Sequence, residues 1–290
     1  MEVAAPETRA LGPWPPGQEV RLLVPIIRAQ TATALMDVGD ALANRAGTSG
    51  EILGLVEIPS GRPDGVAETL TGRRRDLLRW IAATDRSKPG ARLAIQMRVV
   101  HRVAQGIREV VYENQTNLIV IEWPGLGTRR PRALGSVLEN LVLDPPADLI
   151  LVRPDPGRLY VPDRGRILVA LRGGHNAQLA AEAAVALARA HHAELTLLHV
   201  VEGGMEPAAR ARTEGTMRQL AARLGYRRTA TVVRPSPAAA AILKESQAHD
   251  VTVIGAHADA THSPVLVGSE LADTVRRLPG TVIIAKCREP

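Results

Sequence analysis

The chain has 290 residues, of which 45% are hydrophobic and 23% charged, an ordinary composition for one or two globular domains. Its net charge is +6, and its aromatic content of 2%, without any Phe, argues against base-stacking surfaces for nucleic acid. The single cysteine excludes an internal disulfide and fits a reducing compartment. No apolar run approaches the ~18 residues of a membrane span. We therefore expect a cytoplasmic protein with neither a membrane span nor a nucleic-acid partner.

In chain order, the first segment is a proline-rich start without an apolar core. It contains four prolines and acidic residues, which predicts a disordered leader and neither a signal nor a transit peptide. Strand-like runs follow at Arg21 ("RLLVPIIR") and Gly50 ("GEILGLVEIP"), and the basic run Arg73–Arg75 opens an amphipathic helix with a solvated face. Proline and glycine interrupt all periodicity around residues 153–166. We expect a leader at 1–18, a first domain at 19–154, a linker at 155–164 and a second domain at 165–290.

The second half alternates strand and helix patterns. Apolar runs predict strands at 167–171, 195–201, 229–234, 251–254 and 281–286, and helical periodicity predicts helices at 176–192, 206–224, 237–248 and 269–278. Gly225 marks the end of the second of these helices. Buried strands that alternate with helices predict an α/β, Rossmann-like domain with a doubly wound parallel sheet. Ligands of such sheets bind beyond the carboxyl ends of the strands, and Gly255 stands at such an end.

An internal repeat relates the two halves. Residues 117–153 match residues 250–286 without a gap, at an offset of 133 residues, so Gly135-Ser136 falls on Gly268-Ser269. Both segments have the pattern of strand, loop, Gly-Ser, short helix and strand. The repeat predicts a tandem duplication with two like halves. We expect a separate sheet in each half, and a single continuous sheet would contradict the duplication.

Each Gly-Ser pair precedes a helical run. Backbone N–H groups at a helix start can bind a phosphate, glycine lets the ligand approach, and a Ser hydroxyl can donate to a phosphate oxygen. Taken alone, each pair is better explained by helix capping by Ser136 or Ser269. Because the pair occurs twice in the same register, both interpretations stay open.

The spacing Gly255-x2-Ala258-x9-Gly268-Ser269 closely resembles the nucleotide loop of universal stress proteins, whose ATP-binding members have Gly-x2-Gly-x9-Gly-Ser/Thr. "GAHA" is similar to the family's "GSHG", with His257 at the usual His. The resemblance covers nearly all of residues 166–286 and, more weakly, about 20–153. It implies two domains of mainly five parallel strands each, packed as a pseudo-dimer.

The resemblance also implies a site for ATP or another adenine nucleotide, with Mg²⁺ possible beside it. The implied residues are Gly255, His257, Ala258, Gly268, Ser269, Glu270, Arg172 and Val200, whose backbone would face adenine, with Gly125, Gly135 and Ser136 in the first half. Ala258 replaces the loop's second glycine, and Arg172 stands where ATP binders carry an Asp. In the first half, Ile27 or Arg28 takes the place of that Asp, and Glu122 replaces the opening glycine. A carboxylate there would repel phosphate, although it could hold a ribose hydroxyl or a metal.

The sequence shows no catalytic or metal-binding signature among the motifs that identify hydrolases, zinc enzymes and P-loop proteins. The pair His191-His192 is expected to interact with a helix dipole, and His199 to be a satisfied packing residue. His257 and His262 on one loop could bind a metal, but loop histidines more often face solvent or a ligand. Cys287 has no evident activator. We expect no enzyme beyond a weak ATPase.

The first function hypothesis is a tandem universal stress protein, a regulatory and stress-response module with a partly retained nucleotide site. The alternative is an interaction module that binds no nucleotide and docks onto a membrane transporter. In the family that the chain resembles, the tandem form also occurs as cytoplasmic tails of permease or antiporter-type transporters. A nucleotide-dependent enzyme of a related α/β superfamily is a third hypothesis. Self-association through domain pairing would give either a monomer or a homodimer.

Overall fold

The computed structural model describes residues 19–44, 48–57, 72, 75–76, 79, 93–125, 136–158, 161–171, 175–201, 206–235, 237–256 and 269–288. Of Ser136 and residues 269–271 only the backbone is described. The predicted leader lies outside this part of the chain. Of the predicted basic helix, Arg75, Asp76 and Arg79 have helical backbone and exposed side chains, while Arg73 and Arg74 lie outside the described residues.

The first half alternates strands and helices, as its sequence pattern predicts. Its elements are β1 (Val20–Ile26), α1 (Ala29–Ala43), β2 (Thr48–Glu57), β3 (Leu93–Val100), α3 (Val103–Glu113), β4 (Leu118–Glu122), α4 (Ser136–Leu143) and β5 (Asp148–Arg153). Strands β4 and β5 are buried on both faces, which explains their continuous apolar runs.

The second half repeats this plan, and every strand and helix that we predicted there is present. Its elements are β6 (Arg166–Leu171), α5 (His175–Ala190), β7 (Glu194–Val201), α6 (Pro207–Leu224), β8 (Thr229–Pro235), α7 (Ala238–Ser246), β9 (Val251–Gly255), α8 (Ser269–Arg277) and β10 (Thr281–Lys286). Gly225 ends α6 in the left-handed conformation, with φ of 62°, as expected for a glycine at this position.

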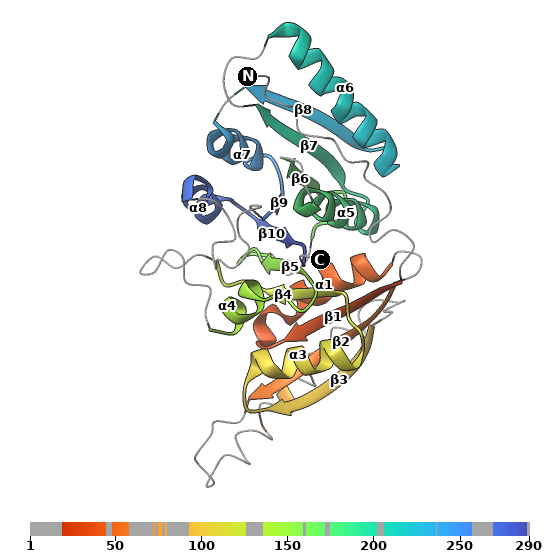
Figure 1. The fold of residues 1–290 in the computed structure, drawn as a ribbon, viewed down its shortest axis with the longest axis vertical. Helices are drawn as coiled ribbons and strands as arrows, with labels where there is room; N and C mark the ends of the chain where they lie inside the picture. Colours follow the sequence, from red (N-terminus) through yellow and green to blue (C-terminus); the bar gives the residue numbers. More distant parts are fainter. Residues whose placement is uncertain are drawn as a thin grey trace.

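All ten strands of the described chain form one sheet, in the order β3-β2-β1-β4-β5-β10-β9-β6-β7-β8. The expectation that a continuous sheet would contradict the duplication is wrong. Each half is a five-stranded parallel sheet with the same internal order, and the two meet edge to edge through the antiparallel pair β5–β10. In Figure 1 these two strands lie in the middle of the molecule, with one half on either side of them.

The repeat extends to individual hydrogen bonds. The first residue after β4 and the first after β9 each donate a backbone N–H across to the last strand of their half, at 2.7 Å: Trp123 to Val152 and Ala256 to Ala285. Just before β4 and β9, side-chain oxygens of Asn117 and Asp250 each accept a backbone N–H from the start of the first strand of their half. The donors are Arg21 in β1, at 2.8 Å from Asn117, and Arg166 in β6, at 2.9 Å from Asp250. Asn117, Trp123 and Val152 match Asp250, Ala256 and Ala285 at the offset of 133 residues, whereas Arg21 and Arg166 lie outside the matched segments. The two halves therefore share corresponding hydrogen bonds as well as a sequence pattern.

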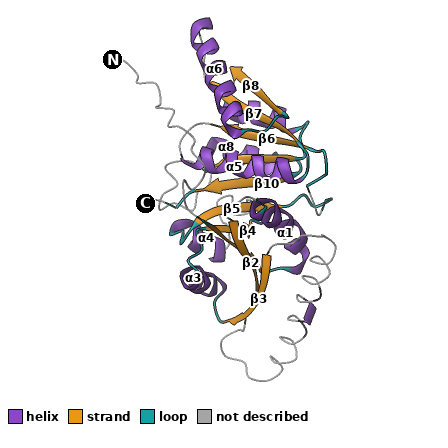
Figure 2. Cartoon of the chain, turned by 90° about the vertical axis from the view of Figure 1, so that its right-hand side faces the viewer, coloured by secondary structure: helices purple, strands orange, loops and turns teal. Residues whose placement is uncertain are grey.

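Helices cover both faces of the sheet (Figure 2). Buried residues of α1, α5 and α6 belong to one hydrophobic cluster, and those of α3, α4, α7 and α8 belong to the other. Successive strand residues alternate between the clusters, as in β6, where Ile167 and Val169 pack on the first and Leu168 and Ala170 on the second. Among the described residues, no helix is both long enough and apolar enough to cross a membrane.

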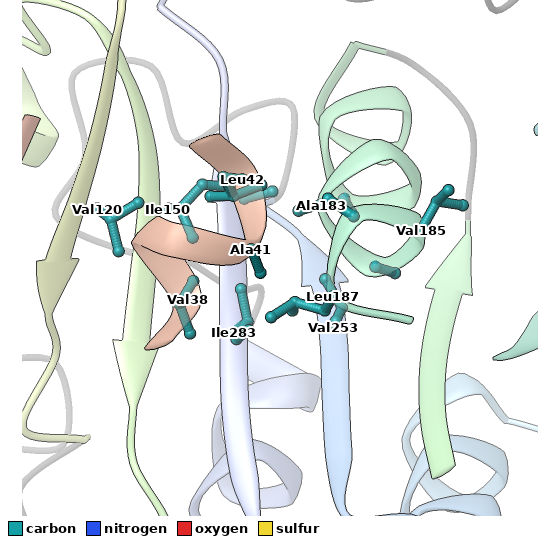
Figure 3. Packing of buried hydrophobic residues seen from close by; sticks show 14 of the residues in the cluster. Val38, Ala41, Leu42, Val120, Ile150, Ala183, Val185, Leu187, Val253 and Ile283 are labelled. Carbon is teal, nitrogen blue, oxygen red and sulfur yellow. The ribbon is translucent and has the colours of Figure 1, made fainter. Parts of the chain in front are cut away.

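The two halves also meet through α1 and α5, which lie side by side over the central strands (Figure 3). Small and aliphatic side chains, such as Ala41 and Ala183, fill the contact above Ile283. Beside it, the buried carboxylate of Asp37 on α1 accepts the backbone N–H of Val161 at 3.0 Å and lies 3.2 Å from His191 Nε2 at the end of α5. The sequence did not predict this contact of His191 with the other half.

Candidate functional site

The predicted site lies at the carboxyl ends of β6 and β9, which are paired neighbours. The chain order runs from β6 to β7 and β8 on one side and to β9 and β10 on the other, so this is the point where the order reverses. Ligands of open α/β sheets bind in the crevice at such a point. Helix α8 begins at Ser269.

The structure describes some of the predicted site residues and leaves others outside. Arg172, His257, Ala258, Gly268 and Gly135 lie outside the described residues, as does His262. Ser269 and Glu270 open α8, and Ser136 opens α4, each known by its backbone. Gly255 ends β9, Val200 lies in β7, and Gly125 follows β4. The first-half and second-half residues belong to two separate switch points.

Gly255 is required by packing inside the second half. A Cβ at this position would lie 2.9 Å from the carbonyl carbon of Asn176 and 3.0 Å from the nitrogen of Ala177, both on the first turn of α5. Only a glycine lets β9 and α5 approach this closely. The contact with helix α5 therefore accounts for the glycine, and its predicted contact with a phosphate stays a prediction.

Asn176, which the sequence analysis did not single out, ties the strand ends together beside Gly255. Its Nδ2 donates to the carbonyl of Ala256 at 2.9 Å, and its Oδ1 accepts the backbone N–H of Cys287 at 2.7 Å. One side chain at the start of α5 therefore fixes the ends of both β9 and β10. Asn176 therefore fixes the position of the strand ends that border the candidate site.

Val200, whose backbone the family resemblance predicts to face adenine, is the next-to-last residue of β7. Strand β7 pairs with β6 only as far as His199, opposite Leu171, so Val200 has no paired residue of β6 among the described residues. Its side chain is half-buried, and its backbone lies just past the end of β6. His199 itself is half-buried, with Nδ1 3.1 Å from the carbonyl oxygen of Leu171, as expected for a satisfied packing residue.

The first half carries an ion pair at its own switch point, where β1 and β4 end side by side. The Glu122 side chain is only 7% exposed and pairs with Arg28, whose Nε donates to Oε2 at 3.0 Å. The hydroxyl of Thr31, in the first turn of α1, donates to the same oxygen at 2.8 Å. Of the two positions considered for the missing Asp, Arg28 is the one that meets Glu122. This carboxylate is neutralised from within the protein.

Gly125 and Trp123 follow Glu122 and contact an arginine from β5. Gly125 has φ of 87°, a conformation that favours glycine, and Trp123 is fully buried. The guanidinium of Arg153 lies 6.0 Å from the centre of the Trp123 ring. Burial lowers the pKa of Arg153, and the nearby carboxylate of Asp155 opposes this shift.

Metal and thiol chemistry find little support in the described part of the chain. It contains no group of three or more His, Cys, Asp or Glu side chains that could hold a metal ion. Burial raises the pKa of the Cys287 thiol to about 12, so at neutral pH the nucleophilic thiolate is scarce. The loop histidines that could bind a metal lie outside the described residues.

Comparison with known proteins places both halves in one family. Residues 21–153 and 164–286 each match the model of the universal stress protein family. A universal stress protein from Archaeoglobus fulgidus DSM 4304 has the same fold, with a TM-score of 0.64, 17% identity, and coverage of 93% of this chain and 99% of that one. The cytoplasmic domain of a prokaryotic cation chloride cotransporter is also similar, with a TM-score of 0.59, 12% identity, and coverage of 92% and 95%. No curated protein matches the chain.

Proposed function

Because the chain belongs to the universal stress protein family and contains two copies of its domain, we propose that it is a cytoplasmic regulatory module that binds an adenine nucleotide in its second half. The observation that carries this proposal is the difference between the two switch points. Glu122 and Arg28 pair across the first, whereas the uncharged Gly255 stands at the matching place of the second.

The chemistry of phosphate favours the second half. A carboxylate at the end of β4 would repel a polyphosphate, and its partner Arg28 is already engaged. At the end of β9, Gly255 adds no charge, and α8 presents the backbone of Ser269 and Glu270 at its positive end. Arg172 would supply a guanidinium for the phosphate groups, and Mg²⁺ would accompany ATP.

Paired variants test the assignment. We expect Gly268→Val and Ser269→Ala to weaken ATP binding about tenfold or more, because the valine side chain would block the approach of phosphate to the backbone and the alanine lacks the hydroxyl donor. Gly135→Val and Ser136→Ala in the first half should leave the affinity unchanged. Isothermal titration with ATP, AMP and cyclic nucleotides, with and without Mg²⁺, measures the affinities. Saturating nucleotide at about 100 times Kd should add roughly 2.7 kcal/mol of stability, seen as a higher melting temperature. Millimolar nucleotide that leaves the melting temperature unchanged contradicts the proposal.

A second candidate is an interaction module that docks onto a membrane transporter and binds no nucleotide. Its support is the likeness of the fold to the cytoplasmic domain of a cotransporter, together with the ion pair between Arg28 and Glu122 at the switch point of the first half. Mass spectrometry of small molecules that copurify with the chain separates the candidates. Recovery of an adenine nucleotide favours the first, and its absence together with an unchanged melting temperature favours the second. Single-turnover release of ADP would add a weak ATPase activity to the first.

The pairing of β5 with β10 within one chain bears on self-association. The edge strands through which the two domains join are both used inside the molecule. We therefore propose a monomer whose halves form the pseudo-dimer, and not a homodimer. Light scattering after size exclusion tests this assignment.

A further inference from the structure

One arginine of the first half holds the helix on which the proposed nucleotide site depends. Arg153, the last residue of β5, donates from Nη1 to the carbonyl of Val275 at 2.9 Å and from Nη2 to the carbonyl of Leu278 at 2.6 Å. Val275 lies in the last turn of α8 and Leu278 is the first residue after this helix, both in the second half. The contact therefore runs from one half of the molecule to the other.

The chemistry at this helix end favours a cation. The last carbonyls of a helix lack partners within the helix, and the helix dipole makes this end negative. A guanidinium that donates to two of these carbonyls supplies the missing hydrogen bonds and places a positive charge at the negative end of the helix. Although burial lowers the pKa of Arg153, an arginine at neutral pH remains charged.

The surroundings of Arg153 leave it little freedom. Its guanidinium lies over the buried ring of Trp123, and a Cβ at Gly125 would lie 3.4 Å from its Cδ. Trp123, Val275 and Leu278 belong to the same hydrophobic cluster. The arginine is thus fixed on one side by the segment that follows β4 and on the other side by α8.

The corresponding helix of the first half is held in a different way. At the end of α4, Arg108 donates to the carbonyls of Asn140 at 2.8 Å and Asp144 at 2.6 Å, and Arg108 lies on α3 of the same half. At the position that the repeat matches to Arg153, the second half has Lys286. The support of α8 from the opposite half is therefore a departure from the symmetry of the duplication.

We propose that Arg153 is a positioning residue for the nucleotide site, through which the first half sets the place of α8. This inference rests on the proposed function, because Ser269 and Glu270 open the same helix. A helix of nine residues is a rigid rod of about 14 Å, so a shift at its carboxyl end moves its amino end as well. The first half, which carries an ion pair at its own switch point, would thus act on the site of the second.

Two measurements on Arg153→Met and Arg153→Lys test the proposal. The first is hydrogen exchange of the amides of α8, and the second is the Kd for ATP. We expect Arg153→Met to speed the exchange of α8 at least tenfold and to weaken ATP binding about tenfold, a typical size for coupling between sites. Arg153→Lys keeps the charge and one donor group, so both effects should be smaller. Arg108→Met is the matched control, which should speed the exchange of α4 and leave the Kd unchanged.

The outcomes separate the positioning role of Arg153 from the proposed binding of nucleotide. Faster exchange of α8 with an unchanged Kd would overturn the positioning role, and so would an exchange rate of α8 no different from wild type. If the wild-type chain binds no nucleotide at all, the proposed function fails, while exchange in Arg153→Met still decides whether the first half holds α8. If Arg153→Met does not fold, Arg153→Lys supplies both readouts, and a wild-type exchange rate and Kd in that variant would overturn the proposal.

Discussion

The ion pair between Arg28 and Glu122 allows a prediction about asymmetric costs. The Glu122 side chain is 7% exposed, whereas that of Arg28 is 54% exposed. Arg28→Met leaves a buried carboxylate with the hydroxyl of Thr31 as a remaining donor, whereas Glu122→Met leaves a cation that already reaches water. We therefore expect the loss of the arginine to destabilise the protein more than the loss of the glutamate.

The magnitudes follow from burial. A buried charge without its partner costs about 3–5 kcal/mol, and the hydrogen bond from Thr31 places Arg28→Met near the lower limit, at about 3 kcal/mol. Glu122→Met should cost about 1 kcal/mol, because the exposed guanidinium is solvated. The double variant removes both charges and should cost about 1 kcal/mol, so the pair is coupled by roughly 3 kcal/mol.

Urea unfolding followed by circular dichroism and by the fluorescence of the buried Trp123 measures these free energies. The control is the exposed pair Arg210–Glu214 on α6, for which each single variant should cost less than about 0.5 kcal/mol. If Arg28→Met costs no more than Glu122→Met, or if the double variant shows the sum of the single costs, the carboxylate is not the buried partner that we describe.

Two further predictions concern single positions. Burial raises the pKa of Cys287 to about 12, so the folded state keeps a proton that the unfolded chain releases between about pH 9 and pH 12. The free energy of unfolding should therefore fall with rising pH by up to about 1.4 kcal/mol per pH unit. Urea titrations at each pH measure this slope, which should be absent in Cys287→Ala. Gly280→Ala should lower the free energy of unfolding by about 3 kcal/mol, because φ of Gly280 is 65° and a Cβ would overlap the carbonyl of Asp250. At Gly125 a Cβ would make only an ordinary contact with Arg153, so Gly125→Ala should cost about 1–2 kcal/mol. Equal costs for the two glycines in the same unfolding assay would contradict this comparison.

The order of elements could be predicted from the sequence because each one carries its own local signal. Strands buried on both faces read as unbroken apolar runs, and Gly225 marks the end of a helix by its conformation. The joining of β5 to β10 has no such local signal, since pairing between edges is a tertiary choice. A hint was nevertheless present, because both strands are continuous apolar runs, and an edge strand open to water is usually protected by charge or proline.

The contacts around the candidate site could not be predicted from the sequence. Arg28 and Glu122 each depart from the family pattern, but they are 94 residues apart and their pairing follows from the fold. The sequence signal for this ion pair was the presence of opposite charges, Arg28 and Glu122, at the ends of two strands that the fold places side by side. The sequence pattern predicts that Gly255 contacts a ligand. Its contact with the first turn of α5 cannot be predicted from the sequence, because it depends on how β9 and α5 pack together. Arg153 and Asn176 act through partners far along the chain, which no local pattern reveals.

The antiparallel pair β5–β10 has an evolutionary consequence. In an assembly of two identical subunits, every substitution is copied onto both sides of the axis, so neither side can specialise. Here both copies are encoded in one polypeptide, so a substitution in one half need not be repeated in the other, and Glu122 corresponds to Gly255 and Arg153 to Lys286. The two sides of the central strand pair can therefore differ in sequence, which two identical subunits cannot.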